Sequence, residues 1–202
     1  NLRPLYQQAI SHPEVVALSI GTRPDCVPDD VLDLLEEVGQ QIPLTVEYGM
    51  QTMHDKSLDW MNRGHYHDTF LDAMQRSVGR GFKLCAHIML GLPGESHADM
   101  MATATEVATH ELDSVKIHNL YVVENTPLAD QLRRGEVTLM DRDDYVKTLV
   151  DFLEIIPPNM VVERVSGEAP GDYFVGPAWC LDKPAVLKAI QHEFDSRNTW
   201  QG

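Results

Sequence analysis

Cysteine is scarce in this sequence, and its three cysteines, Cys26, Cys85 and Cys180, lie far apart. No two of them form a CxxC pair, so neither a zinc site nor a disulfide framework is indicated. No uninterrupted apolar run reaches roughly 18 residues, so no membrane span is expected. Basic residues are outnumbered, with 16 Lys and Arg against 31 Asp and Glu. The net charge of −15 disfavours a broad electrostatic grip on nucleic acid but leaves a local basic patch open.

The start of the chain also lacks two features. Asn1-Leu2-Arg3-Pro4 contains no apolar segment of the kind found in signal peptides, and no initiator methionine is present. The sequence opens on what reads as a helix at 2–11, so we expect a fragment of a longer protein. Cysteine usage is compatible with a reducing compartment, and we expect a cytoplasmic protein.

What is present is typical of a globular protein. The 202 residues are 43% hydrophobic and 23% charged, enough for one good-sized domain. The clearest structural signal is the stretch Lys83–Glu95 (KLCAHIMLGLPGE), and its pattern recurs along the chain. An apolar run bounded by glycine and proline predicts a buried strand, and Ser96 with Asp99 resembles a capping box that opens a helix. In parallel α/β proteins such a strand–turn–helix unit places the turn where ligands bind.

The same unit recurs along the chain. Strands are expected at 15–20, 44–49, 83–90 and 114–123, separated by helices at 28–39, 55–81 and 96–111. This alternation indicates an α/β fold with a parallel sheet. After residue 128 the rhythm changes. Helices are expected at 128–134, 138–156 and 183–198, a strand at 160–165 and a loop at 166–183.

Every expected strand ends in polar or glycine residues. The clusters are Gly21, Thr22, Arg23 and Asp25; Glu47, Gly49 and Gln51; His87 with the turn at 91–95; and His118, Asn119, Glu124 and Asn125. Polar residues at the carboxyl ends of parallel strands are where such folds place their sites. For one cluster, turn formation and helix capping are the simpler explanation. For four in succession, we favour a shared site.

Single residues are more ambiguous. Arg63 lies at a helix break, where a guanidinium suits a carboxylate clamp, but a surface arginine fits equally well. His87 lies inside an apolar run, where a hydrogen-bonded core histidine is commoner than a catalyst. The aromatic segment 173–179 either covers the mouth of a barrel or packs as a tail. No catalytic residue is identified, and no metal ligands are expected.

Five short motifs together resemble one family. In order they are TRPD (Thr22–Asp25), EYGMQT (Glu47–Thr52), NRGH (Asn62–His65), HIMLGLPGE (His87–Glu95) and ENTPL (Glu124–Leu128). The set resembles the later part of a radical S-adenosylmethionine (SAM) core, as in the catalytic subunit of Elongator and in oxygen-independent coproporphyrinogen dehydrogenase. With the tail at 163–183, the chain is most similar to bacterial YhcC-type radical SAM proteins.

The resemblance implies a partial (β/α)6 barrel. Here it would be truncated to about its last four βα units at 1–156, with a C-terminal extension at 157–202. It also implies SAM and a 4Fe-4S cluster as cofactors. The cluster, reduced by an electron donor, cleaves SAM to a 5′-deoxyadenosyl radical that takes a hydrogen atom from the substrate.

The family's SAM contacts carry over by motif position. Gln51 is expected to bind a ribose hydroxyl, and Arg63, twelve positions later, the SAM carboxylate. His87 stands where the porphyrin enzyme has an acidic ribose ligand. The complete expected set of cofactor-binding residues is Gly21, Thr22, Arg23, Glu47, Gln51, Arg63, His87, Gly91, Glu124 and Asn125, with Gly91, Glu124 and Asn125 approaching the adenine.

One departure from the family stands out. The CxxxCxxC motif that binds the cluster is absent from the 202 residues. We therefore expect the C-terminal part of a longer protein, inactive by itself. The strand at 15–20 would then be an exposed edge, and we expect it to pair with another chain or its own terminus, or else to be poorly ordered.

Three functions remain to be weighed. The first is a radical SAM enzyme as parent, with tRNA as an expected substrate because TRPD and NRGH are Elongator-like. The second is a non-catalytic binding module that keeps the barrel without the cluster. The third, a barrel hydrolase or aldolase, ranks lowest, because Lys83 and Lys116 lie near strand starts, the wrong end for a Schiff base.

Overall fold

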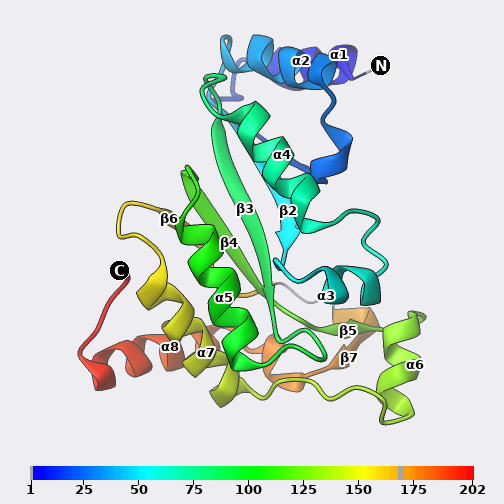
Figure 1. Ribbon diagram of the computed structural model, residues 1–202, viewed down its shortest axis with the longest axis vertical. Coiled ribbons are helices and arrows are strands. Elements are labelled where there is room, and N and C mark those ends of the chain that lie inside the picture. Colours follow the sequence, from blue (N-terminus) through cyan, green and yellow to red (C-terminus); the bar gives the residue numbers. More distant parts are fainter. Residues whose placement is uncertain (1, 168–170) are drawn as a thin grey trace. The chain divides into compact units, whose positions relative to one another are not determined.

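The computed structural model describes residues 2–167 and 171–202, and Figure 1 labels its elements. The helices are α1 (Arg3–Ile10), α2 (Asp29–Gly39), α3 (Asp55–Trp60), α4 (His67–Ser77), α5 (His97–Ala108), α6 (Pro127–Arg133), α7 (Arg142–Ile155) and α8 (Lys183–Arg197). The strands are β1 (Leu18–Thr22), β2 (Leu44–Gln51), β3 (Lys83–Leu90), β4 (Ser114–Asn119), β5 (Val122–Val123), β6 (Val161–Arg164) and β7 (Phe174–Gly176). Short 3-10 turns lie at Pro24–Cys26, Gly171–Tyr173 and Ala178–Leu181.

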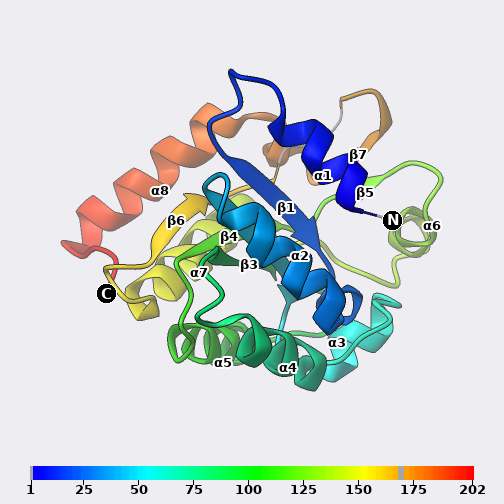
Figure 2. The same cartoon turned by 90° about the horizontal axis from the view of Figure 1, so that it is seen from above.

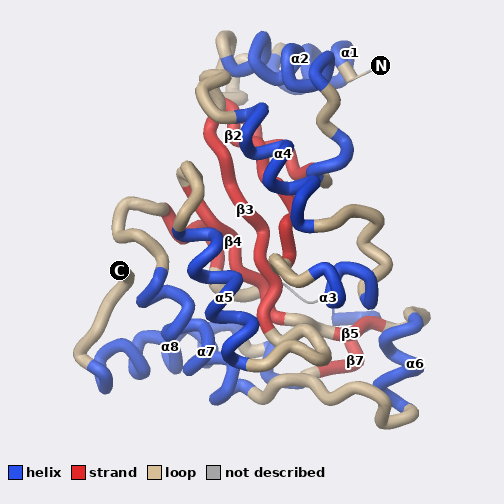
Figure 3. The backbone as a smooth tube through the Cα atoms, viewed as in Figure 1, coloured by secondary structure: helices blue, strands red, loops and turns tan. Residues whose placement is uncertain are grey.

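The α/β class is confirmed. Strands β1-β2-β3-β4-β6 are hydrogen-bonded neighbours in that order, and β5 pairs with β7 in an antiparallel ribbon; Figure 3 draws the strands in red. β1 therefore ends the strand order. Among the described residues, no helix is long and apolar enough to cross a membrane.

The chain forms two compact units. The first comprises Asn1–His87 with Glu111–Val115, and the second Ile88–His110 with Lys116–Gly202. Each unit is a part of the chain that is densely packed within itself. The expected division into a barrel at 1–156 and an extension at 157–202 stays a prediction.

The first unit is built on the parallel pair β1 and β2. Leu18 lies opposite Leu44, and Gly21 opposite Glu47. Helix α2 begins with Asp29 and Asp30, whose carboxylates suit the positive end of the helix dipole. The core contains fully buried side chains from β2, α2 and α4, namely Val46, Tyr48, Met50, Leu32, Leu35, Phe70 and Ala73. This core holds the carboxyl ends of β1 and β2 in place.

The second unit contains helices α5, α7 and α8. The capping box expected at Ser96 is present, because the Asp99 amide donates to Ser96 Oγ at 3.2 Å and the Ser96 amide to Asp99 Oδ2 at 2.8 Å. Helix α7 packs against both α5 and α8, and the α7–α8 pair is visible in Figure 2. The apolar faces of these helices form the core of the unit.

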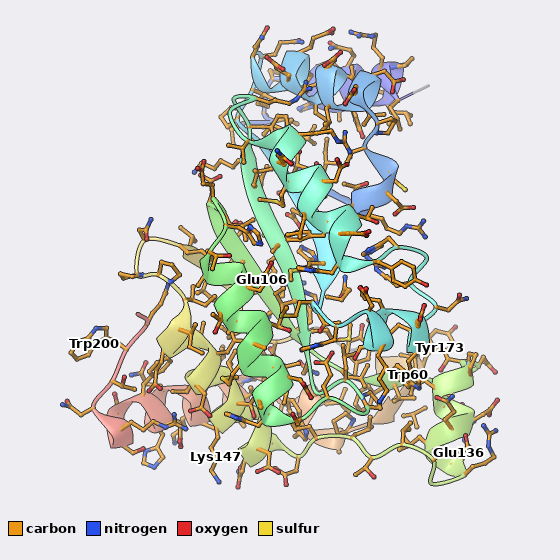
Figure 4. All side chains as sticks on the ribbon, in the orientation of Figure 1. Trp60, Glu106, Glu136, Lys147, Tyr173 and Trp200 are labelled. Carbon is orange, nitrogen blue, oxygen red and sulfur yellow. The ribbon has the colours of Figure 1, made fainter. Side chains whose placement is uncertain are left out.

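The aromatic tail packs inside the second unit. The Trp179 ring lies 5.0 Å, centroid to centroid, from Tyr145 of α7, and its indole N–H donates to the Met140 carbonyl at 3.0 Å. Two other aromatic residues of the second unit are exposed instead. Tyr173 and Trp200 are 61% and 70% exposed, and both are labelled in Figure 4.

Several expected boundaries were wrong. The strand expected at 114–123 breaks after Asn119, because that side chain is buried and bonded to the tail. The helix expected from residue 138 begins at Arg142, because the Asp141 side chain caps it by accepting from the Asp144 amide. The first strand starts at Leu18, three residues later than expected. The loop expected at 166–183 contains β7, and its residues 168–170 lie outside the described part.

Asn119 connects β4 to the tail of the second unit. Its amide group donates to Cys180 Sγ at 2.9 Å, and its carbonyl oxygen accepts from the Gly167 amide at 2.9 Å. We expect Asn119→Ala to lower the free energy of unfolding by about 1 to 3 kcal/mol, because it leaves a buried backbone N–H without its acceptor. Urea unfolding monitored by tryptophan fluorescence tests this. A change below about 0.5 kcal/mol would show that the tail does not depend on Asn119.

Candidate functional site

The candidate site lies at the carboxyl ends of β1 and β2. Successive side chains of a strand point to opposite faces, so Glu47, Gly49 and Gln51 share one face of β2. By the same rule Ser19 and Gly21 share a face of β1, and Gly21 lies opposite Glu47. The parallel register therefore gathers these residues on one side of the first unit.

A cavity of about 380 Å³ occupies this position. Its lining consists of Gly21, Thr22, Arg23, Glu47, Gly49, Gln51, Arg63 and His87. Seven of the ten residues expected to bind the cofactor thus line one cavity, and all of them belong to the first unit. The volume falls in the range typical of small-molecule sites.

Arg63 brings a positive charge to this cavity, with no salt bridge to it among the described residues. It follows α3 between Asn62 and Gly64, which both have left-handed backbone angles (φ of 51° and 79°) and break the helix. Its Nη2 donates to the Gly49 carbonyl at 3.2 Å, but its buried Nε makes no hydrogen bond within the described residues. Burial lowers the pKa of Arg63, and the neighbouring Arg23 lowers it further, whereas the carboxylate of Asp25 acts in the opposite direction. The guanidinium nevertheless stays charged and lacks an acidic partner in the described chain.

Gln51 ends β2 in a strained conformation. Its φ of +69° is unusual for a residue with a side chain. The Gln51 amide forms no hydrogen bond with other described side chains, and it lines the cavity. Such strain is frequent at ligand sites, because the surrounding fold holds the residue in place.

Glu47 and His87 form a hydrogen-bonded pair in the cavity wall. His87 Nε2 lies 2.7 Å from Glu47 Oε2, and Ser19 Oγ donates to Glu47 Oε1 at 2.7 Å. Glu47 is only 7% exposed. A carboxylate accepts hydrogen bonds, so His87 carries a proton on Nε2 in this pair. The cavity therefore holds a carboxylate on β2 as well as the guanidinium of Arg63.

Arg23 is compensated locally. Its Nε donates to Asp25 Oδ1 at 2.9 Å, and a second nitrogen contacts the other carboxylate oxygen. This hydrogen-bonded pairing lowers the pKa of Asp25 and raises that of Arg23. Arg63 is therefore the arginine of the cavity for which no salt bridge is seen among the described residues, although Asp25 acts on it through space.

His65, two residues after Arg63, is 6% exposed. Its Nε2 is buried without a hydrogen bond in the described structure, and its Nδ1 lies 3.4 Å from the Tyr66 carbonyl. Burial lowers the pKa of His65 below its ordinary 6.5, and the positive charges of Arg63 and Arg23 also lower it. His65 is therefore neutral near pH 7.

This lowered pKa predicts a pH effect on stability. Below about pH 6.5 the unfolded chain binds a proton at His65 that the folded chain does not, so the free energy of unfolding falls as the pH falls. His65→Gln removes this contribution. We expect urea unfolding between pH 8 and pH 5 to show a smaller pH-dependent loss in the variant than in the wild type. Equal losses would contradict a neutral buried His65.

Three of the expected residues belong to the second unit. Gly91 has a φ of +83°, as its turn requires, and Glu124 forms an ion pair with Arg133. Asn125 lines a separate cavity of about 570 Å³ together with Thr126, Pro127, Asp130, Gln131 and Arg134. Approach of Gly91, Glu124 and Asn125 to the adenine stays a prediction.

Some residues of the site were not among the expected contacts. Gly49 was named in the cluster at the end of its strand but not among the cofactor contacts. Ser19, which hydrogen-bonds Glu47, was not named, although the period-two pattern of a strand places it on the same face as Gly21. Asp25 and His65 lie within the TRPD and NRGH motifs, but only the folded chain shows what they contact. Within the described residues, no cluster of three His, Cys, Asp or Glu side chains fits a metal ion.

Family models match almost the whole chain. The model for the radical SAM superfamily matches residues 3–107, and that for the radical SAM C-terminal domain matches residues 112–196. The chain belongs to the radical SAM superfamily. The expected family is thereby confirmed, and the residues that line the cavity all lie in the first matched segment.

Curated relatives place the chain more narrowly. It is 39% identical to the uncharacterized protein YtqA of Bacillus subtilis, over 100% of this chain and 62% of YtqA. It is 38% identical to protein YhcC of Escherichia coli, over 90% of this chain and 59% of YhcC. A tRNA uridine(34) acetyltransferase of Methanocaldococcus jannaschii is 28% identical over 79% of this chain and 30% of that enzyme. The chain thus spans about 60% of the length of YtqA and YhcC.

A solved structure supports the fold. Elp3 of the archaeon Methanocaldococcus infernus superposes with a TM-score of 0.80 at 23% sequence identity, covering 92% of this chain and 43% of the Elp3 chain. At this identity the likeness establishes the fold alone. It agrees with the partial radical SAM barrel expected from the motifs.

Proposed function

We propose that the cavity at the ends of β1 and β2 binds S-adenosylmethionine. The observation that carries the proposal is Arg63, a partly buried guanidinium with a buried, unbonded Nε and no acidic partner among the described residues. Such a group is costly unless a ligand supplies an anion. The amino-acid carboxylate of SAM is such an anion, and a guanidinium binds a carboxylate through two parallel hydrogen bonds.

The remaining lining residues suit the rest of this ligand. Gln51 and His87 offer polar groups of the kind that bind ribose hydroxyls. A Cβ placed on Gly21 would have no atom within 4 Å, so this backbone leaves open space in which a ligand can approach closely. When bound beside a reduced 4Fe-4S cluster, SAM supplies a 5′-deoxyadenosyl radical. The residues of this chain bind and orient the cofactor.

The cysteine ligands of the 4Fe-4S cluster are not found in these 202 residues. Cys26 is exposed, whereas Cys85 and Cys180 are buried, and the sequence has no CxxxCxxC motif. YtqA and YhcC are longer than this chain. We propose that a full-length parent supplies the cysteines and receives electrons from a donor in a reducing cytoplasm. On this view the 202 residues by themselves are inactive.

A tRNA substrate is the finer part of the proposal. It is supported by the similarity to a tRNA uridine(34) acetyltransferase. The net charge of −15 gives no broad basic surface, so tRNA binding would depend on a local patch or on the rest of the parent. Self-association through β1, the last strand in the sheet order, is a further proposal.

The decisive experiment uses the full-length protein that carries this chain. It is reconstituted anaerobically with iron and sulfide, reduced, and given SAM, and 5′-deoxyadenosine is measured by chromatography. We expect a cluster absorbance band and formation of 5′-deoxyadenosine. Neither would form if the parent were a non-catalytic binding module, the alternative suggested by the missing CxxxCxxC. SAM binding without either signal would favour that alternative.

A further inference from the structure

The carboxylate of Glu47 has no role in the proposed site so far. Holding it in the cavity wall requires several contacts, because a buried carboxylate is costly unless it is hydrogen-bonded. Ser19 and His87 each provide one bond of 2.7 Å, so the carboxylate is fixed in position. Glu47 is 7% exposed and still lines the cavity.

The cavity therefore presents charges of both signs. Arg63 supplies a positive charge, and Glu47 contributes a carboxylate held in the wall by its hydrogen bonds to Ser19 and His87. Arg23 is compensated by Asp25. A ligand that carries both a carboxylate and a separate fixed positive charge matches this pattern. In a partly desolvated cavity such charges interact more strongly than in water.

We infer that Glu47 is a specificity residue that favours a sulfonium ligand over the neutral thioether that corresponds to it. The inference rests on the proposed SAM site and extends it. SAM and S-adenosylhomocysteine share the carboxylate, amino group, ribose and adenine, but only SAM carries the positive sulfonium. Glu47 attracts that charge through space, whereas Arg63 contributes equally to the binding of both ligands.

The test compares the dissociation constants of SAM and S-adenosylhomocysteine in the full-length protein by calorimetry. Glu47→Gln removes the charge and keeps the shape of the side chain. We expect the preference for SAM over S-adenosylhomocysteine to fall about tenfold, mainly through weaker SAM binding. Glu37→Gln makes the same charge change at an exposed side chain of α2, outside the cavity, and is expected to leave the preference unchanged.

A second variant separates charge from hydrogen bonding and covers the case in which Glu47→Gln does not fold. His87→Gln keeps the Glu47 carboxylate and removes a group that can become positive. The preference for SAM is expected to stay equal or rise. A fall in His87→Gln, or an unchanged preference in folded Glu47→Gln, would overturn the inference. If neither ligand binds the wild type, the proposed SAM site itself is wrong.

Discussion

Replacing Arg63 with glutamine is expected to weaken SAM binding by roughly 30- to 150-fold. The change removes a charge-assisted pair with the ligand carboxylate, which contributes about 2 to 3 kcal/mol. Arg63→Lys keeps the charge but loses the planar two-nitrogen fork, so we expect an intermediate loss of about tenfold. Calorimetric titration of the full-length protein measures both variants.

The free energy of unfolding shows separately whether Arg63 is needed for the fold. Its guanidinium lacks an acidic partner among the described residues and lies near the like charge of Arg23. Arg63→Gln loses the hydrogen bond to the Gly49 carbonyl but also removes a partly buried charge, so the free energy of unfolding should change by less than about 0.5 kcal/mol. The control is Arg3→Gln, the same charge change at an exposed pair with Glu37. Equal SAM affinity in the wild type, Arg63→Gln and Arg3→Gln would show that Arg63 does not bind the carboxylate.

Gly49→Ala is expected to weaken SAM binding by at least about tenfold with little loss of stability. An added Cβ would lie 2.2 Å from Arg63 Nη2 and 2.8 Å from Gln51 Nε2, so both side-chain ends must move. Both are ends of flexible side chains, and moving them costs the fold little. A displacement of about 1 Å in a binding group is enough to cause a large loss of function.

Two glycine variants control for this effect. Gly39→Ala adds the same methyl group in α2, where the nearest atoms lie 3.6 Å away, and should leave SAM binding unchanged. Gly21→Ala meets no protein atom within 4 Å, so it should leave stability unchanged. The proposed geometry would be contradicted if Gly49→Ala bound SAM as tightly as Gly39→Ala.

The elements were largely predictable because their signals are local. The strand at Lys83–Leu90 and the capping box at Ser96 were predicted as observed, since apolar runs and capping side chains act within a few residues. The break after Asn119 was not predictable. It depends on Cys180 and Gly167, which lie 61 and 48 positions away along the chain.

The sequence alone determined the family and the α/β class, because both depend on motifs and apolar runs that are local in the sequence and follow one another in a fixed order. The family motifs and the polar clusters at the strand ends also named most of the cavity lining. Only the tertiary structure decided which charges meet. That Arg23 pairs with Asp25, that Arg63 lacks a described acidic partner and that Glu47 bonds Ser19 and His87 depend on through-space distances between separate elements.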